Sequence, residues 1–298
     1  MIRDARVLRA GFVPQEVEHR DAEVTHLSSV LRPLTDGEPA DTALVTGPSG
    51  AGKTCISQFV TERLREEALD IEATYINCWR NHTRFRTLYQ LLDDIGKTID
   101  IHRQSTPHDE LIDRLQQYDG NRTVVILDEA DQLEDTSVIY DLHSLPQFAV
   151  ICITNNEEDL FGRVDDRLVS RLRASERVRM DTYADEQLVD ILSARVKRGL
   201  KADVITDEQL YAIADAAAGD ARLAIGILRT AASAADRENH DRITDSLLDE
   251  AAEDARTQIR QKSLDSLTPH QRIVYDIIKD DGPLSPTQIP HQYAADVE

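Results

Sequence analysis

The spacing of apolar residues divides the chain into an alternating first part and an entirely helical second part. Up to about residue 182, apolar runs of strand length alternate with stretches in which apolar positions recur every three or four residues. This alternation is typical of parallel βαβ units, in which helices cover both faces of a sheet. We expect strands over residues 42–46, 73–78, 123–127, 149–153 and 177–180, and helices over residues 23–31, from 52 onward, 84–99 and 107–117.

Beyond Thr182 the strand pattern stops and amphipathic helices follow. Residues 185–199 carry their apolar side chains on one stripe. Thr206 and Gln209 have the spacing of a capping box, which predicts the start of the next helix, and Gly219 is expected to end it. A third helix is expected over residues 222–235, so this region is predicted to be all-helical.

The C-terminal residues indicate the start of a third part. Pro269 stands where the first position of a helix is expected, and a further short helix is expected from Ser285. We therefore expect an α/β domain over residues 1–182, a helical domain over residues 183–262 and the beginning of another domain over residues 263–298.

One segment has the pattern G-x-x-x-x-G-K-[ST] and stands between a predicted strand and a predicted helix. It consists of Gly47, Pro48, Ser49, Gly50, Ala51, Gly52, Lys53 and Thr54, and Cys55 follows it. The glycines allow backbone N–H groups to converge on phosphate oxygens at a helix N-terminus. Lys53 is expected to reach the β- and γ-phosphates, and the Thr54 hydroxyl to bind Mg²⁺. This pattern predicts a nucleoside triphosphate site.

Two acidic residues follow the third predicted strand, as a phosphate-binding loop requires. Asp128 and Glu129 come directly after the apolar run 124–127. We expect Asp128 to hold Mg²⁺ through water and Glu129 to polarise the attacking water. RNA helicases share the tetrad Asp-Glu-Ala-Asp, but they need a second α/β domain after it. Only two further strands are predicted here, which argues against a helicase.

Composition limits the cellular setting more than it limits the partners. The chain has 34 Lys and Arg against 55 Asp and Glu, a net charge of −21. Such a surface either repels nucleic acid or reflects adaptation to molar salt, and we favour salt adaptation. At 1 M salt the Debye length is about 3 Å, so the charge neither excludes DNA nor argues for it. Three separated cysteines form no disulfide or zinc pattern, and no apolar run suggests a signal peptide or a membrane span, so we expect a cytoplasmic protein without a membrane partner.

Taken together, these motifs resemble the AAA+ ATPases, and among them the archaeal and eukaryotic replication initiators of the origin recognition complex and cell division control type. The resemblance is carried by the phrases 12–14, 75–78, 153–156 and 219–222. It implies a parallel P-loop AAA+ sheet sandwiched by helices, an all-helical lid domain and a partial winged-helix domain.

The resemblance also implies roles for particular residues. Val13 belongs to a lead-in that packs near the adenine, and Tyr183 begins the lid. Asn155 matches the polar sensor at the tip of the fourth strand, and Arg222 matches the lid arginine that reaches the γ-phosphate when the lid closes. Arg171 matches an arginine finger, which acts across a subunit interface, with Arg167 and Arg173 as competing candidates.

The function implied is that of a slowly hydrolysing, ATP- and Mg²⁺-dependent switch in DNA replication. Double-stranded DNA at replication origins is the implied partner, together with a replicative helicase or other initiator subunits. The chain as given lacks the recognition helix of a winged-helix domain, which argues against sequence-specific binding and suggests either a fragment or a short paralogue. Two alternatives remain: a regulator of a protein partner without specific DNA binding, and a clamp-loader-like ATPase that uses Arg171.

Overall fold

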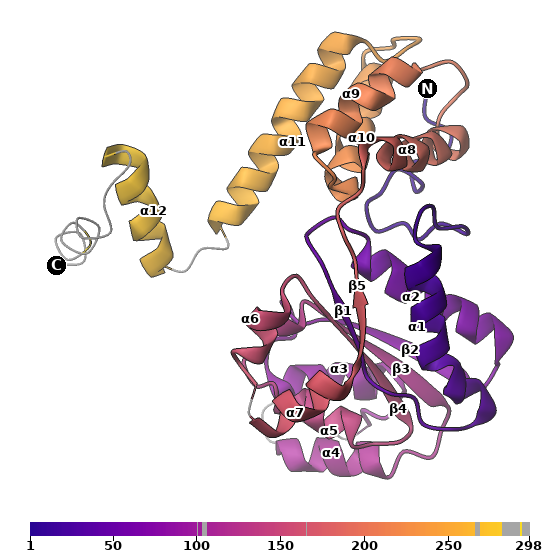
Figure 1. Cartoon of the computed structure of the whole chain (residues 1–298), viewed down its shortest axis with the longest axis vertical. Coiled ribbons are helices and arrows are strands. Elements are labelled where there is room, and N and C mark those ends of the chain that lie inside the picture. Colours follow the sequence, from indigo (N-terminus) through magenta and orange to yellow (C-terminus); the bar gives the residue numbers. More distant parts are fainter. Residues whose placement is uncertain (100, 103–105, 165, 266–268, 282–292, 294–298) are drawn as a thin grey trace.

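The first domain is built on one parallel sheet (Figure 1). The structure is a computed structural model that describes residues 1–99, 101–102, 106–164, 166–265, 269–281 and 293. Within these residues the strand order is β2-β3-β4-β1-β5, and every neighbouring pair is parallel. The strands are β1 (Ala43–Thr46), β2 (Ile71–Asn77), β3 (Arg122–Asp128), β4 (Phe148–Thr154) and β5 (Glu176–Arg179). The five predicted strands are thus confirmed.

Helices cover both faces of this sheet because successive strand residues point to opposite sides. On one face, α1 (Asp21–Leu31) and α2 (Lys53–Glu67) pack on alternate residues of β1, β3 and β4. The opposite face is covered by α3 (Arg84–Asp94), α4 (His108–Gln116), α5 (Ser137–His143), α6 (Glu157–Phe161) and α7 (Asp166–Ala174). The predicted sandwich of a parallel sheet between helices is therefore confirmed.

The second domain is a group of helices (Figure 1) with a hydrophobic core of its own. It consists of α8 (Asp185–Gly199), α9 (Asp207–Ala217), α10 (Ala221–Arg237) and α11 (Asp245–Asp265). The sequence pattern indicates the first three of these helices but not α11. The first turns of α11 bury the side chains of Leu247, Leu248 and Ala251 in the core, whereas charged and polar residues dominate the remaining sequence of the helix.

One predicted helix is longer than the observed one. The pattern predicts a helix over residues 84–99, whereas α3 ends at Asp94. Gly96 has a φ of +70°, and the Lys97 backbone N–H donates to the Leu92 carbonyl at 2.7 Å. A glycine with positive φ followed by this hydrogen bond is typical of a helix C-cap, which the spacing of apolar residues alone does not reveal.

The N-terminal residues pack on the helical domain rather than on the sheet. Ile2 forms an antiparallel bridge with Leu200, and Leu8, 1% exposed, lies in the core of the helical domain. In Figure 1 the N-terminus accordingly lies beside α8 and α9. The first residues of the predicted 1–182 domain therefore pack on the predicted 183–262 domain. The boundaries between the predicted domains stay a prediction.

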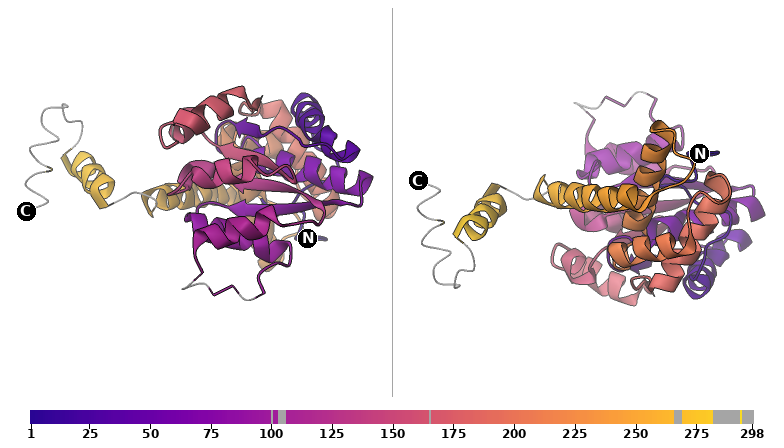
Figure 2. Two further views of the ribbon diagram at one scale, coloured as in Figure 1. Left: turned by 90° about the horizontal axis from the view of Figure 1, so that it is seen from below. Right: turned by 90° about the horizontal axis from the view of Figure 1, so that it is seen from above.

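The C-terminal part contributes one described helix, α12 (Pro269–Asp281), which begins at the predicted proline (Figure 2). The short helix expected from Ser285 lies outside the described residues, apart from Tyr293. Among the helices that the structure describes, none is both long and apolar enough to cross a membrane.

Candidate functional site

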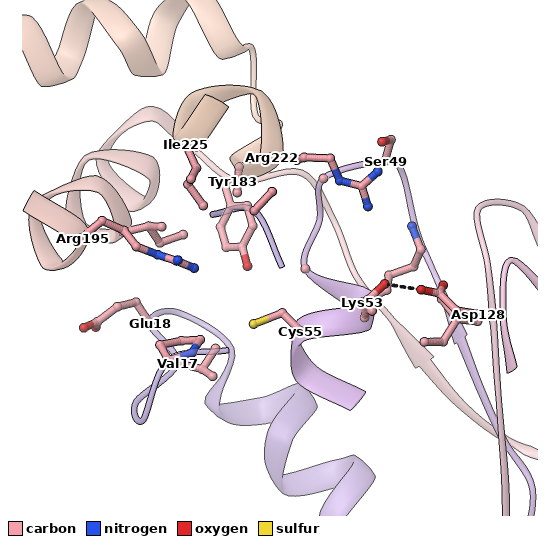
Figure 3. Close-up of a pocket in the computed structure, with 18 of the residues that line it drawn as sticks. Val17, Glu18, Ser49, Lys53, Cys55, Asp128, Tyr183, Arg195, Arg222 and Ile225 are labelled. Atoms are coloured by element: carbon pink, nitrogen blue, oxygen red, sulfur yellow. Dashed lines mark hydrogen bonds between the residues drawn. The ribbon is translucent and has the colours of Figure 1, made fainter. Parts of the chain in front are cut away.

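A cavity lies between the sheet domain and the helical domain (Figure 3). Its floor is the loop between β1 and α2, together with the carboxyl ends of β3 and β4. Helices α8 and α10 form its roof, and residues 10–18 form a third wall. The lining residues that come from the predicted site are Ser49, Gly50, Gly52, Lys53, Thr54, Cys55, Asp128, Glu129, Asn155, Tyr183 and Arg222.

The loop after β1 needs glycine where it touches its neighbours. Gly47 has a φ of +148°, and a Cβ there would lie 2.1 Å from the Met180 carbonyl oxygen. Gly50 has a φ of +72°, and its Cβ would lie 1.9 Å from Oδ1 of Asp220 in the helical domain. The Ala221 backbone N–H also donates to the Gly50 carbonyl at 3.2 Å. The helical domain is therefore docked directly on the phosphate-binding loop.

Lys53 is buried at the centre of the site, with 8% of its surface exposed. Its Nζ donates to the carbonyls of Gly47 and Pro48, at 2.6 and 2.7 Å, and to Oδ1 of Asn155 at 2.9 Å. Burial lowers the pKa of the Lys53 ammonium to about 8, although the Asp128 carboxylate opposes this, and the Arg222 cation lowers it further. Lys53 and Arg222 thus place two positive charges beside the phosphate-binding loop, which is the electrostatic setting for a polyanion.

The Asp128 carboxylate is fixed by three donors. The hydroxyls of Thr54 and Tyr75 both donate to Oδ2 at 2.8 Å, and the Glu129 backbone N–H donates to Oδ1 at 3.0 Å. Burial raises the pKa of the Tyr75 phenol well above its usual range, with the Asp128 carboxylate adding to the effect, so Tyr75 is a permanent donor.

Thr54 and Asp128 fit the requirements of Mg²⁺. A hydroxyl and a carboxylate lie side by side, and Mg²⁺ prefers such oxygen donors, completing its shell with water and substrate phosphates. The described residues contain no cluster of three or more His, Cys, Asp or Glu that could hold a metal alone.

Glu129 follows Asp128 in a left-handed conformation, with a φ of +57°. This turn separates its side chain from that of Asp128, and Nδ2 of Asn77 donates to Glu129 Oε2 at 3.2 Å. Tyr75 and Asn77 thus support the two acidic residues, a role that sequence reasoning missed. Residues two apart on a strand share one face, but only the pairing of β2 with β3 places that face beside the two acids, so the spacing alone does not reveal this role.

Among the predicted site residues that do not line the cavity, three lie in the core or on the outer surface of the sheet domain. Val13 packs against the core below α1 and α2, while its neighbours Pro14 and Val17 line the cavity. Ala51 is fully buried in the same core. Arg171 lies on α7, with its guanidinium 4.4 Å from the centre of the Tyr140 ring.

Two loop residues and one of the competing arginines line a different groove. Gly47 and Pro48 line a second groove behind Lys53, which Asn155 and Arg173 also line. The Arg167 side chain lies outside the described residues. Within one chain, therefore, the predicted site residues that are described line the cavity, except Val13, Ala51 and Arg171, and except Gly47 and Pro48, whose carbonyls accept hydrogen bonds from Lys53.

A parallel sheet that bears a phosphate-binding loop and an acidic strand end, covered by a helical lid, defines an AAA+ ATPase. Two family models agree with this: an AAA domain matches residues 38–164, and a Cdc6 AAA+ ATPase-type lid domain matches residues 189–256.

Similar proteins identify the branch of this class. ORC1-type DNA replication protein 9 of Halobacterium salinarum is 78% identical over 100% of this chain and 84% of its own length. ORC1-type DNA replication protein 1 of the same organism is 53% identical over 98% and 95%. The chain therefore belongs to the ORC1-type DNA replication proteins, the replication-initiator AAA+ ATPases, as its motifs predict.

Solved structures support the same assignment. The Aeropyrum pernix ORC1 protein, solved in complex with DNA, has a TM-score of 0.76 and 26% identity, covering 99% of this chain and 81% of that one. Cdc6p of Pyrobaculum aerophilum shares the fold with a TM-score of 0.78 at 22% identity, over 98% and 83%.

Proposed function

We propose that the chain binds ATP with Mg²⁺ between its two domains and hydrolyses it slowly, as a nucleotide-controlled switch in DNA replication. The observation that carries this proposal is the placement of two hydrogen-bonded pairs, Lys53 with Asn155 and Thr54 with Asp128, in one cavity with the lid cation Arg222. Backbone N–H groups at the start of α2 would bind the phosphates, and Lys53 would leave its carbonyl partners for the β- and γ-phosphates.

Hydrolysis would use the two supported acids differently. Mg²⁺, held by Thr54 and Asp128, would neutralise charge on the phosphates. Glu129, which Asn77 orients, would polarise a water molecule for attack, and Asn155 would hydrogen-bond that water or the γ-phosphate. The slow rate is part of the proposal, since a switch needs a long-lived ATP state.

The lid would report which nucleotide is bound. Arg222 lies in the first turn of α10, whose N-terminus is docked on Gly50, and it extends toward Ser49 (Figure 3). A γ-phosphate would hold this cation in place, and hydrolysis would remove that contact. Arg171, exposed on α7, would act only on a nucleotide bound by a neighbouring subunit.

Double-stranded DNA at replication origins is the proposed macromolecular partner, with other initiator subunits or a replicative helicase as protein partners. The related Aeropyrum pernix ORC1 protein, solved with DNA, supports the DNA assignment. DNA binding should be measured in molar KCl with and without ATP and Mg²⁺, against random and origin-like duplexes. ATP-dependent binding supports the initiator proposal, whereas intact ATP affinity without any DNA binding favours a switch that acts on a protein.

The nucleotide proposal is tested by Lys53→Ala. This variant should lose measurable ATP binding in titration calorimetry, because no other described side chain places a cation beneath the cavity beside Asp128. Tight ATP binding by Lys53→Ala would overturn the assignment of the phosphate site.

A further inference from the structure

Residues 2–18, here called the strap, connect the lid to the nucleotide cavity. At its start, the strap bonds to the end of α8: the backbone N–H groups of Arg3 and Asp4 donate to the Gly199 carbonyl at 2.8 and 3.1 Å. Leu8 inserts into the core of the helical domain. Ala10, Pro14, Glu16, Val17 and Glu18 then line the cavity. The same short segment is thus part of the lid and part of the cavity wall.

Arg195 on α8 is the side chain that holds the strap in this course. It is 7% exposed, and its Nη1 donates to the carbonyls of Val7 and Arg9 at 2.5 and 3.2 Å. Its Nη2 donates to the Phe12 carbonyl at 3.1 Å, and the Phe12 ring lies 5.1 Å from the guanidinium carbon. Three carbonyls within six residues therefore converge on one cation.

The bonding of Arg195 is unusual for a buried cation. No carboxylate of the described residues lies within ion-pair distance of it, and burial lowers the pKa of its guanidinium. A buried charge is costly unless its donors are bonded. Here the donors are bonded to main-chain carbonyls, so the cation sets the path of the backbone rather than neutralising an acid.

Arg195 also lies where a nucleoside would be. Ile191, Ala194 and Arg195 line the cavity from one face of α8, because residues three and four apart share a helix face. In Figure 3, Arg195, Val17 and Glu18 lie at one end of the cavity, and Lys53 and Asp128 lie at the other. With the phosphates at Lys53, the ribose and base would face the strap and α8.

The far end of the strap region is fixed at the junction of the two domains. Nη2 of Arg20 donates to the Asp181 carbonyl at 2.5 Å, and the guanidinium lies 4.1 Å from the centre of the Tyr183 ring. Nε2 of His19 lies 2.8 Å from Oδ2 of Asp190 on α8. The strap is therefore attached to α8 at its start through Gly199, and His19, directly after its end, contacts Asp190 of the same helix. Arg195 holds its middle.

We propose that Arg195 is a positioning residue that binds the strap to α8, so that strap and lid form one wall for the nucleoside half of the bound nucleotide. This inference rests on the proposed ATP site and adds to it the role of Arg195, which is to hold the strap on α8. The phosphate end is bound by the sheet domain and is independent of Arg195. The nucleoside end is bound by the strap and the lid together, and contact with the nucleoside stabilises their association.

The test compares a ligand that has a nucleoside with one that has none. Titration calorimetry in molar KCl would measure ADP and inorganic tripolyphosphate on the wild-type chain, Arg195→Met and the matched control Arg198→Met. Arg198 lies on the same helix but is exposed. Losing several hydrogen bonds from a charged donor should weaken ADP binding by about 10- to 100-fold in Arg195→Met. Tripolyphosphate affinity should change by less than about twofold, and Arg198→Met should bind both ligands as the wild type does.

Several results would overturn the inference in distinguishable ways. Unchanged ADP affinity in Arg195→Met, or equal weakening of ADP and tripolyphosphate, would remove the proposed role of Arg195. If the wild-type chain binds neither ligand, the proposed ATP site itself is wrong.

Arg195→Lys, which keeps the charge but not the planar set of donors, should show an intermediate loss of ADP affinity.

Hydrogen exchange on the unaltered chain provides a test that does not depend on the folding of a variant. ADP should slow amide exchange in residues 2–18 and in α8, whereas tripolyphosphate should leave these segments unchanged. Exchange in the strap that is indifferent to ADP, or that tripolyphosphate slows equally, would contradict the proposal.

Discussion

Removal of the Tyr75 hydroxyl tests whether Asp128 is held in place for Mg²⁺. In Tyr75→Phe, Oδ2 of Asp128 keeps the Thr54 hydroxyl at 2.8 Å but loses the second donor at the same distance. A hydrogen bond to a charged group contributes about 1.5–3 kcal/mol. Tyr75 is 40% exposed, so water can replace part of this bond, and about 1 kcal/mol is the expected cost. That corresponds to roughly a fivefold loss in the contribution of Mg²⁺ to ATP affinity.

The assay is the ratio of ATP dissociation constants in EDTA and in Mg²⁺, measured by calorimetry. Tyr75→Phe should lower this ratio and leave ATP affinity in EDTA nearly unchanged, because the phosphate-binding loop is intact. Tyr211→Phe, on the exposed surface of α9, is the matched control. In an Asp128→Asn background Tyr75→Phe should have no further effect on the ratio, since the carboxylate is already lost. An unchanged ratio in Tyr75→Phe, or an equal effect in that background, would refute the reasoning.

Three further predictions concern neighbouring parts of the site. Burial lowers the pKa of Lys53 to about 8, and a bound phosphate favours the charged form of its ammonium, so ADP binding takes up a proton above that pH. The affinity for ADP should therefore fall by up to about tenfold per pH unit above pH 8. Constant affinity for ADP from pH 7 to 9.5 would contradict this. Asn77→Ala should slow single-turnover hydrolysis by about tenfold with ATP affinity retained, since Glu129 loses its orienting donor while the phosphate-binding loop is untouched. A loss of affinity would point to a general defect, because Asn77 Oδ1 also accepts from the Arg80 backbone N–H. Arg171→Ala should lower hydrolysis only at concentrations where subunits associate, measured alongside light scattering, and an equal defect in dilute monomer would exclude a role across subunits.

The parts of the site that are continuous in sequence could be predicted, because their chemistry depends on local spacing. Gly47–Thr54 and the pair Asp128 and Glu129 each combine a strand end with the residues that follow it. Asn155 and Arg222 were reached through family likeness, and the structure brings both to the same cavity. The strand order, by contrast, does not follow from apolar spacing and is seen only in the sheet.

The supporting residues depend on long-range packing and could not be predicted. Tyr75 and Asn77 act on Asp128 and Glu129 because β2 pairs with β3 in a register that places Asn77 beside Asp128. Arg195 depends on a strap whose sequence lies more than 180 residues earlier. Val13, which the resemblance places near the adenine, stays a prediction: it packs against the core of the sheet domain, and its neighbours Pro14 and Val17 line the cavity.

The most direct test of an ATPase site between the two domains is the behaviour of Glu129→Gln. The substitution keeps the volume of the side chain and removes the base that would polarise water. ATP affinity should stay within about twofold of the wild type, while single-turnover hydrolysis falls by roughly 100-fold or more, the scale of losing a positioned base. Hydrolysis at the wild-type rate in Glu129→Gln would show that water is activated elsewhere and would contradict the assignment of the site.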